Sequence, residues 1–261
     1  MDGWQVWLGG LVALLALMTA TWIVSVVRRD ASLVDRVWGL AFVVAAVTYA
    51  VLGDGATPRV VLALVLVTIW GLRLAAYITW RNWGDGEDPR YVRMRERDDA
   101  FVVTSLFKVF WLQAAIAWVV SLPLLAAVTA SEPAGLTWVD AVAVVVWTVG
   151  FVFEAGGDWQ LSRFLADPAN RGKVMDRGLW RYTRHPNYFG DTTVWWGLFL
   201  LALATGAWWA AVGSIVMTFF IVRVSGVALT DRGMSSSGSK REGYDEYVRR
   251  TNAFFPGPRR A

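Results

Sequence analysis

Long apolar segments constrain this chain more than any other feature of its sequence. A helix needs roughly 20 mainly apolar residues to cross the hydrocarbon core of a bilayer, and all its backbone polar groups must be paired within the segment. Seven segments approach or reach that length: Trp4–Val27, Val37–Leu52, Val60–Trp80, Phe101–Val128, Thr137–Phe153, Thr192–Thr205 and Ala207–Leu229. The sequence therefore predicts an all-α, polytopic membrane bundle of about seven transmembrane helices, forming a single domain over residues 1–261. The second, fifth and sixth segments are short, and the last two meet at Thr205-Gly206, so six spans are the alternative.

Basic residues gather in every second connection between these segments. They are Arg28, Arg29 and Arg36; Arg81, Arg90, Arg93, Arg95 and Arg97; Arg163, Arg171, Lys173, Arg177, Arg181 and Arg184; and, in the tail, Arg232, Lys240, Arg241, Arg249, Arg250, Arg259 and Arg260. Because cytoplasmic loops are enriched in lysine and arginine, this pattern predicts an N-terminus outside and a C-terminus in the cytoplasm. We expect an integral protein of a bacterial inner (cytoplasmic) membrane, with a lipid partner from the bilayer and no nucleic acid.

The chain is 56% hydrophobic and contains no cysteine and a single histidine, His185. Soluble domains are nearer 45–50% apolar, which agrees with a membrane protein. The lack of cysteine excludes a disulfide, a thiol nucleophile and an iron–sulfur cluster. Zinc usually takes several cysteine or histidine ligands, so we expect no metal.

The single histidine lies in an arginine-rich stretch just before an apolar segment. Pro186 suits the first position of a helix, where its missing N–H would have no partner in any case. A helix that begins there directs free N–H groups towards Arg181, Arg184 and His185, an arrangement that favours phosphate-bearing ligands. The alternative is that the two arginines only mark the cytoplasmic end of a transmembrane helix.

Polar pairs at helical spacing flank this stretch. Glu154 and Asp158 share one helical face near the end of the fifth segment, and Asn187 and Asp191 repeat the spacing after Pro186. Together with the basic loop between them, they suggest a nucleotide cradle. The chain contains neither a G-x-G-x-x-G nor a P-loop motif, so such a site would not use a standard nucleotide-binding turn.

Arg73 lies midway along the third segment, where an ionisable group points to function by default. It shares a helix face with Tyr77. That face predicts a pocket with polar groups, while the alternative is that Arg73 extends to the membrane surface or pairs with Asp35 to hold helices together.

Three stretches, EAGGDWQL, GKVMDRGLWRYTRHPNYFGDTTVWWG and SKREGYDEYVRRTNAFFP, resemble the C-terminal domain of the steroid 5-alpha-reductase-like membrane enzymes, above all their bacterial branch. The similarity covers most of the chain and is strongest from Glu154 to Pro256. It implies a membrane protein, commonly of seven helices, that binds NADPH on the cytoplasmic side and reduces an activated C=C bond in a steroid, sterol or enoyl lipid. Residues 1–128 would form the substrate pocket and residues 129–261 the cofactor-binding part.

The resemblance also implies roles for individual residues. Polar contacts to the dinucleotide fall to Glu154, Asp158, Asn187, Tyr188 and Asp191, and phosphate contacts to Arg171, Lys173, Arg181, Arg184 and His185. A tail that closes over the cofactor would include Arg241, Tyr244, Tyr247 and Thr251. Asp191 replaces the glutamate that is more frequent in the family, which shortens its reach.

The catalytic pair departs from the family pattern. In the steroid enzymes a tyrosine paired with a glutamate polarises the substrate carbonyl, but here Trp70 occupies the apparent position of that tyrosine and the second segment has no glutamate. Tyr77, oriented by Arg73 or Asp35, is the substitute that we predict.

Two other functions remain open from the sequence. Membrane methyltransferases that use S-adenosylmethionine share an R-H-P-x-Y-x-G segment, but their cofactor carries no phosphate and needs fewer cations. A non-enzymatic lipid-binding protein would use the arginines only for topology and for anionic lipids.

Overall fold

The structure is a computed structural model that describes residues 1–227, 230–231 and 241–260. Over these ranges it contains helices and no β-strand, and one isolated bridge pairs Lys173 with Glu242. The predicted all-α class is therefore confirmed. The end of the seventh predicted segment, Ala228-Leu229, lies outside the described residues, as do Arg232 and the start of the tail motif, Ser239-Lys240.

Among the described residues, five helices are long and apolar enough to cross a membrane. They are α1 (Gly3–Arg28), α2 (Leu33–Leu52), α3 (Thr57–Arg81), the continuous helix Phe101–Val120 and α8 (Trp138–Ala166). The chain is thus an integral membrane protein with several apolar helices. The helix α9 (Pro186–Leu203) is not among the five, and the apolar helix Trp208–Val224 is shorter. Seven spans and the orientation of the termini stay predictions.

The chain divides into two compact units. Unit 1 comprises Met1–Thr137 and Leu201–Gly213, and unit 2 comprises Trp138–Leu200 and Ser214–Ala261. Unit 1 contains α1 to α3, α4 (Pro89–Glu96), α5 (Phe101–Ser105), the π-helical segment η1 (Leu106–Trp111), α6 (Leu112–Val120), α7 (Leu122–Thr129) and the short η4 (Trp208–Ala210). Unit 2 contains α8, the short helices η2 (Pro168–Asn170) and η3 (Gly178–Arg181), most of α9 and of α10 (Ala211–Phe219), the π-helical segment η5 (Phe220–Ser225) and α12 (Tyr244–Arg250).

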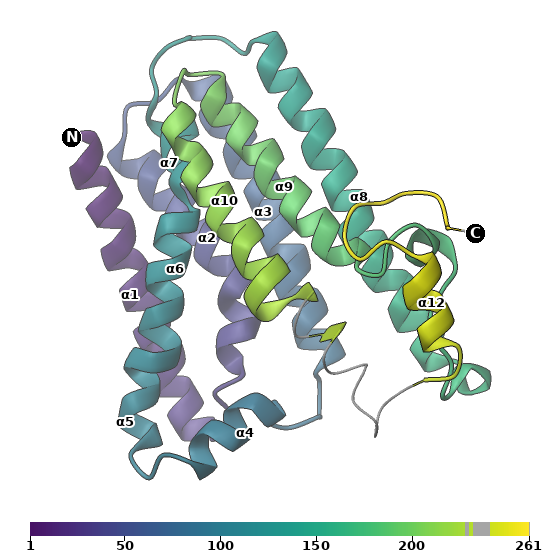
Figure 1. Ribbon diagram of the computed structural model, residues 1–261. Coiled ribbons are helices and arrows are strands. Elements are labelled where there is room, and N and C mark those ends of the chain that lie inside the picture. Colours follow the sequence, from purple (N-terminus) through teal and green to yellow (C-terminus); the bar gives the residue numbers. More distant parts are fainter. Residues whose placement is uncertain (228–229, 232–240, 261) are drawn as a thin grey trace. The chain divides into compact units, whose positions relative to one another are not determined.

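In unit 1 the helices α1, α2 and α3 run side by side (Figure 1). The α2–α3 contact is closest at two glycines, because a Cβ on Gly39 would lie only 2.5 Å from the carbonyl oxygen of Gly71. Next to them, the buried rings of Phe42 and Trp70 pack edge to face, with centroids 5.7 Å apart. This part of the core is apolar.

The fourth predicted segment, Phe101–Val128, is not one continuous helix. The chain turns at Ser121, between α6 and α7, because Pro123 at the start of α7 has no N–H to continue the hydrogen-bond ladder of α6. The helix that can cross a membrane therefore ends at Val120.

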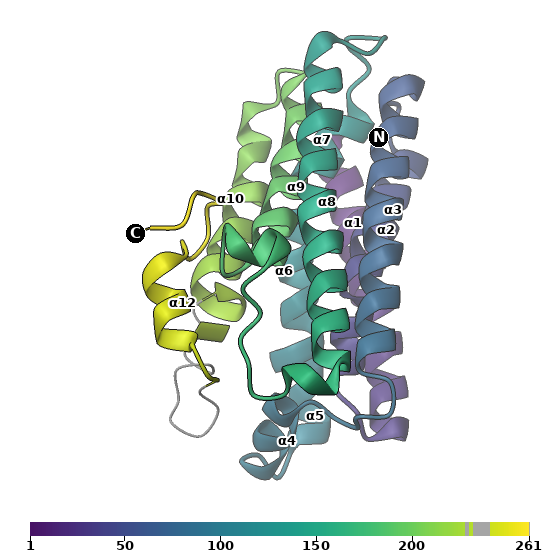
Figure 2. The same cartoon turned by 90° about the vertical axis from the view of Figure 1, so that its right-hand side faces the viewer.

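In unit 2 the helices α8 and α9 lie alongside each other (Figure 2). Glycines again bring the two backbones together, since a Cβ on Gly150 would lie 2.5 Å from the backbone nitrogen of Val194, and one on Gly190 would overlap the backbone nitrogen of Glu154. The predicted apolar segment ends at Phe153, but α8 continues to Ala166. Two of the polar residues in this extension, Glu154 and Asp158, are buried.

Candidate functional site

A partly buried polar pair, Asp158 and Asn187, lies where α8 meets the beginning of α9. The helix α9 starts at Pro186, as the sequence predicted, which places Asn187 in its first turn. The Asn187 side chain donates from Nδ2 to the carboxylate of Asp158, at 3.0 Å. Gly157 allows this approach, because a Cβ there would lie 3.1 Å from the backbone nitrogen of Asn187. Glu154 and Asp158 are only 3% and 4% exposed, so two carboxyl groups are held away from water at this point.

The amide oxygen of Asn187 is an acceptor that the protein leaves open. Its Oδ1 atom is buried and accepts no hydrogen bond from the residues that the structure describes. A buried polar atom without a partner costs about 1–3 kcal/mol, so such atoms are rare in stable folds. The position therefore suits a ligand that offers an N–H or O–H donor.

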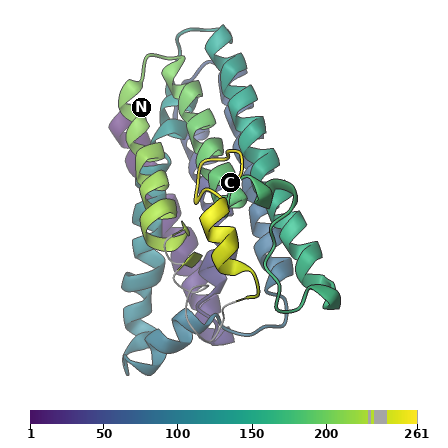
Figure 3. The ribbon, with the colours of Figure 1, turned by 45° about the vertical axis from the view of Figure 1, so that its right-hand side comes forward.

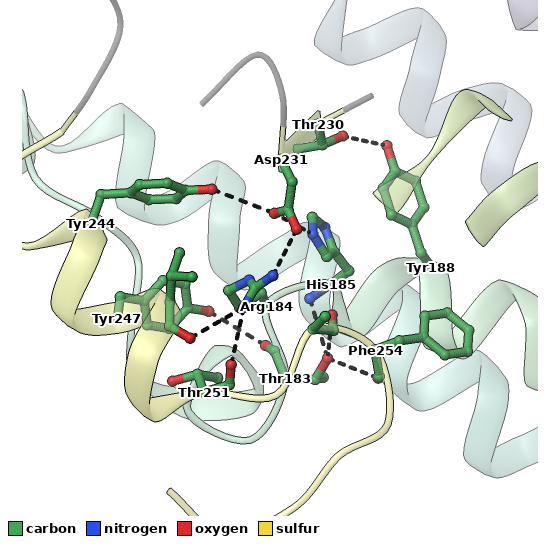
Figure 4. Close-up of polar contacts among 12 residues, drawn as sticks. Thr183, Arg184, His185, Tyr188, Thr230, Asp231, Tyr244, Tyr247, Thr251 and Phe254 are labelled. Atoms are coloured by element: carbon green, nitrogen blue, oxygen red, sulfur yellow. Dashed lines mark hydrogen bonds and ion pairs between the residues drawn. The ribbon is translucent and has the colours of Figure 1, made fainter. Parts of the chain in front are cut away.

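A second cluster is centred on Asp231, a residue that the sequence analysis did not single out (Figure 4). Arg184 donates from Nη2 to Oδ2 of Asp231 at 2.7 Å, and Nε2 of His185 lies 3.0 Å from Oδ1. Burial of the carboxyl group alone would raise the pKa of Asp231, but the hydrogen bonds from His185 and Arg184 outweigh burial and lower this pKa to about 2. Asp231 is therefore ionised at neutral pH and can only accept, which assigns the hydrogen to Nε2 of His185.

The C-terminal residues are held against the segment that precedes α9 (Figure 3). The backbone N–H of Arg184 donates to the carbonyl of Asn252 at 2.9 Å, and that of Gly257 donates to the carbonyl of Tyr182 at 3.0 Å. Side chains add to this contact, because Arg184 donates to the carbonyls of Val248 and Thr251 at 3.3 and 3.2 Å. We call these contacts of residues 182–184 with residues 248–257 the tail clasp.

Two tyrosines of α12 strengthen the tail clasp. Tyr247 is buried and donates its hydroxyl to the carbonyl of Trp180 at 2.7 Å. Burial raises the pKa of Tyr247, so it stays a neutral donor at physiological pH. Tyr244 makes a longer bond of 3.4 Å to Asp231. Tyr244 and Tyr247, which the sequence predicted to close over a cofactor, thus contact Asp231 and Trp180 of the protein itself.

The other predicted cofactor residues fall into three positions. Tyr188 stacks on His185, with centroids 5.6 Å apart, and its hydroxyl lies 3.3 Å from that of Thr230. The hydroxyl of Thr251 is buried and makes no hydrogen bond to the described residues. Asp191 is half-buried one turn after Asn187 on α9.

The predicted phosphate-binding cations divide into two groups. Arg171, Lys173 and Arg181 are exposed. Arg171 and Arg241 line one pocket of about 340 Å³, together with Asp167 and Asn170. Arg184 and His185 are instead engaged with Asp231, so only the first group offers its charge to solvent.

The predicted catalytic pair lies in unit 1. The guanidinium carbon of Arg73 lies 5.1 Å from the centroid of the Tyr77 ring, and that of Arg81 lies 5.5 Å from it. Two cations thus flank the tyrosine. Asp35 accepts hydrogen bonds from Arg90 at 2.8 Å and from the hydroxyl of Tyr91 at 2.9 Å.

The importance of Asp231 was missed because it is a single acidic residue at the end of an apolar segment, 46 and 47 residues from its partners. A carboxylate beside the only histidine would have been a signal, but the two are far apart in the sequence. No group of three or more histidine, aspartate or glutamate side chains suited to a metal ion occurs among the described residues.

Comparison with known proteins gives a family and one relative without an assigned activity. An uncharacterized protein of Schizosaccharomyces pombe is 29% identical over a region that covers 73% of this chain and 63% of the relative. The chain thus matches less than two thirds of that protein's length. No solved structure matches the chain significantly. Residues 21–251 match the family described as "Protein of unknown function (DUF1295)", which contains steroid 5-alpha-reductase-like proteins, and the chain belongs to this family.

Proposed function

We propose that this protein is an NADPH-dependent membrane reductase that transfers hydride to an activated C=C bond of a lipid, such as a steroid, a sterol or an enoyl chain. The observation that carries the proposal is the partly buried Asp158–Asn187 pair, whose buried amide oxygen has no hydrogen-bond partner among the described residues. A buried oxygen without a partner among apolar helices is costly unless a ligand donates a hydrogen bond to it.

The donor and acceptor groups of unit 2 fit NADPH. The open oxygen of Asn187 is suited to the N–H of the nicotinamide carboxamide. Arg171 and Arg241, at the pocket of about 340 Å³, are suited to a phosphate. S-adenosylmethionine carries no phosphate and only one carboxylate, so it would offer this pair of arginines less negative charge than the phosphates of NADPH do.

The residues of the protein would polarise the substrate and exclude water during hydride transfer. NADPH supplies the hydride. Tyr77 donates a hydrogen bond to the carbonyl oxygen of the substrate, where negative charge builds up during reduction. The guanidinium groups of Arg73 and Arg81 near its ring favour that charge. The apolar helices provide a substrate from the bilayer with surroundings that exclude water.

Thermal unfolding of the detergent-purified chain tests the cofactor. A ligand that binds only the folded state raises the unfolding temperature by mass action, so NADPH should do so at sub-millimolar concentration and S-adenosylmethionine should not. Asn187→Ala and the double variant Arg171→Ala/Arg241→Ala should each weaken the NADPH response at least tenfold. Arg163→Ala is the matched control, because it removes one exposed charge at the end of α8, outside the pocket.

The outcomes separate the functions. Stabilisation by S-adenosylmethionine alone would make the protein a methyltransferase. No response to either cofactor, or an NADPH response that both site variants retain, would contradict the reductase.

Reduction itself is tested with a further variant, Tyr77→Phe. Enones of graded size are mixed with the protein, and NADPH consumption is followed by absorbance. We expect Tyr77→Phe to lower the rate at least tenfold while leaving the NADPH-dependent thermal shift unchanged. Loss of both, or of neither, would remove Tyr77 from the proposed role.

A further inference from the structure

A pocket separate from the site above lies within unit 1, between the end of α1 and the start of α5. Its volume is about 450 Å³, and its lining includes Ser25, Arg29, Ala31, Arg95, Phe101 and Ser105. Neither the predicted catalytic pair nor any predicted cofactor residue belongs to it. The combination of two arginines, two buried hydroxyls and apolar walls calls for an explanation.

Arg29 adopts a backbone conformation that side chains disfavour. Its φ of 52° makes it the only non-glycine residue in the left-handed region among those that the structure describes. Glycine is the usual residue at this position after a helix. The turn directs the N–H groups of Arg29 and Asp30 back to the carbonyls at the end of α1, at 3.3 and 3.0 Å. The carbonyls of Ser25 and Val26 beside the pocket are therefore paired, which lowers their repulsion of an anion.

The guanidinium of Arg29 is exposed and makes no hydrogen bond or ion pair with the described residues. Neighbouring arginines differ, because Arg36 pairs with Asp30 at 3.4 Å and Arg90 pairs with Asp35 at 2.8 Å. The structure thus keeps a strained arginine at the pocket without an acidic partner.

Arg95 is a second cation, fixed in place on two sides. It donates from Nε and Nη2 to Glu87, at 3.2 and 2.7 Å, and its guanidinium carbon lies 4.7 Å from the centroid of Phe101. These bonds leave its Nη1 group without a partner among the described residues. Glu87 balances one of the two arginines, so the pocket retains one positive charge.

The hydroxyl groups complete the chemistry. Ser25 donates to the carbonyl of Trp22 at 2.8 Å, and Ser105 donates to that of Val102 at 3.0 Å. Both serine oxygens therefore remain available as acceptors. A ligand that fits carries one negative charge, hydroxyl donors beside it, and an apolar part.

We propose that this pocket binds the phosphate of an anionic phospholipid with a hydroxyl-bearing headgroup. Arg29 and the free Nη1 of Arg95 hold the phosphate, and the serines accept from the headgroup hydroxyls. The phosphate chemistry is shared with free inorganic phosphate. The apolar walls contributed by Val26, Phe101 and Val102 favour the lipid.

The test uses the full chain in detergent with three probes: short-chain phosphatidylglycerol, short-chain phosphatidylcholine and inorganic phosphate. Binding is read by thermal unfolding and by native mass spectrometry. Phosphatidylglycerol should stabilise the protein, while phosphatidylcholine, which has no net charge, should bind at least tenfold more weakly. Inorganic phosphate should have no effect at the same concentration.

Arg29→Gly is the decisive variant, because glycine removes the cation and relieves the backbone at once. We expect its unliganded unfolding temperature to be unchanged or higher, and its affinity for phosphatidylglycerol to fall at least tenfold. Arg28→Ala is the matched control, since it removes an adjacent charge that does not line the pocket, and should change the affinity less than twofold.

Three results would overturn the proposal. They are equal binding of the two lipids, full affinity for phosphatidylglycerol in Arg29→Gly, and stabilisation by inorganic phosphate as strong as that by the lipid. The last result would identify free phosphate as the occupant.

Discussion

The α2–α3 contact in unit 1 and the α8–α9 contact in unit 2 are built in the same way, but different kinds of side chain lie beside them. In both, glycines bring two helix backbones together. Beside Gly39 and Gly71 the contact is filled by the apolar rings of Phe42 and Trp70. Along α8 and α9 it leads instead to the bonded side chains of Asp158 and Asn187. Close packing of helices in a membrane thus does not by itself indicate a site. A site is indicated where the packing encloses polar groups.

Substitution of the two sets of glycines should have the largest effect on stability. It also shows which of the two helix contacts matters for cofactor binding as well as for packing. Gly71→Val and Gly190→Val each insert a side chain against a neighbouring backbone, and overpacking costs about 1–3 kcal/mol, or more where the backbone must move. A cost of 1 kcal/mol corresponds to about 2–4 °C for a chain of this size. Only Gly190→Val should also abolish the NADPH response, as measured by thermal unfolding with and without the cofactor. Equal loss of that response in Gly71→Val would contradict the distinction.

The second largest effect should be the loss of stability at low pH that comes from Asp231, in the polar cluster of unit 2. The ordinary pKa of the carboxyl group is 3.8, and in the folded chain that of Asp231 is about 2. Its ionised form therefore stabilises the fold above about pH 4, and this contribution is lost as the pH falls from 4 towards 2. Unfolding temperatures of Asp231→Asn, measured over this pH range, should lack the part of the fall in stability that comes from protonation of Asp231. Asp99→Asn, an exposed aspartate of unit 1, serves as the control and should keep the decline.

The smallest expected effect is the loss of stability when one buried tyrosine hydroxyl is removed from each unit. Tyr247 donates to the carbonyl of Trp180, and the hydroxyl of Tyr49 lies 2.7 Å from that of Ser121. Replacement of either by phenylalanine should cost about 1 kcal/mol. Only Tyr247→Phe should speed cleavage by trypsin at the exposed residues Arg249 and Arg250, as followed by mass spectrometry. Equal cleavage rates in the two variants would show that Tyr247 does not fasten the tail.

Much of the fold follows from local rules, which is why hydropathy and helix-start signals predicted it. Five of the seven apolar segments coincide at least in part with helices that can cross a membrane, and Pro186 marked the start of α9 correctly. The spacing of Glu154 and Asp158 already placed both on one helical face beyond Phe153. The continuation of α8 to Ala166 was not predicted, because hydropathy treats polar residues as exposed and cannot see that these two are buried.

The candidate site was predictable in its residue types and less so in their partners. An arginine binds a phosphate, a carboxylate or a carbonyl oxygen with the same donors, so sequence alone does not show that Arg184 contacts Asp231 and the tail. Asn187 was easier, because its spacing from Asp191 placed it on a helix face next to a carboxylate pair. Partner choice depends on residues brought together from distant parts of the chain.

The tail clasp determines when the backbone amides that it covers become accessible to solvent. Its central contacts join backbone to backbone, from Arg184 to Asn252 and from Gly257 to Tyr182. These two contacts do not depend on the side chain of Tyr182, and their amides are shielded only while the tail is in place. Because nearby hydrogen bonds at the edge of a fold open together, the amide hydrogens of Arg184 and Gly257 should exchange with solvent deuterium as one group, well before those of α8. The rate of that exchange measures how often the end of the chain detaches from the region around His185.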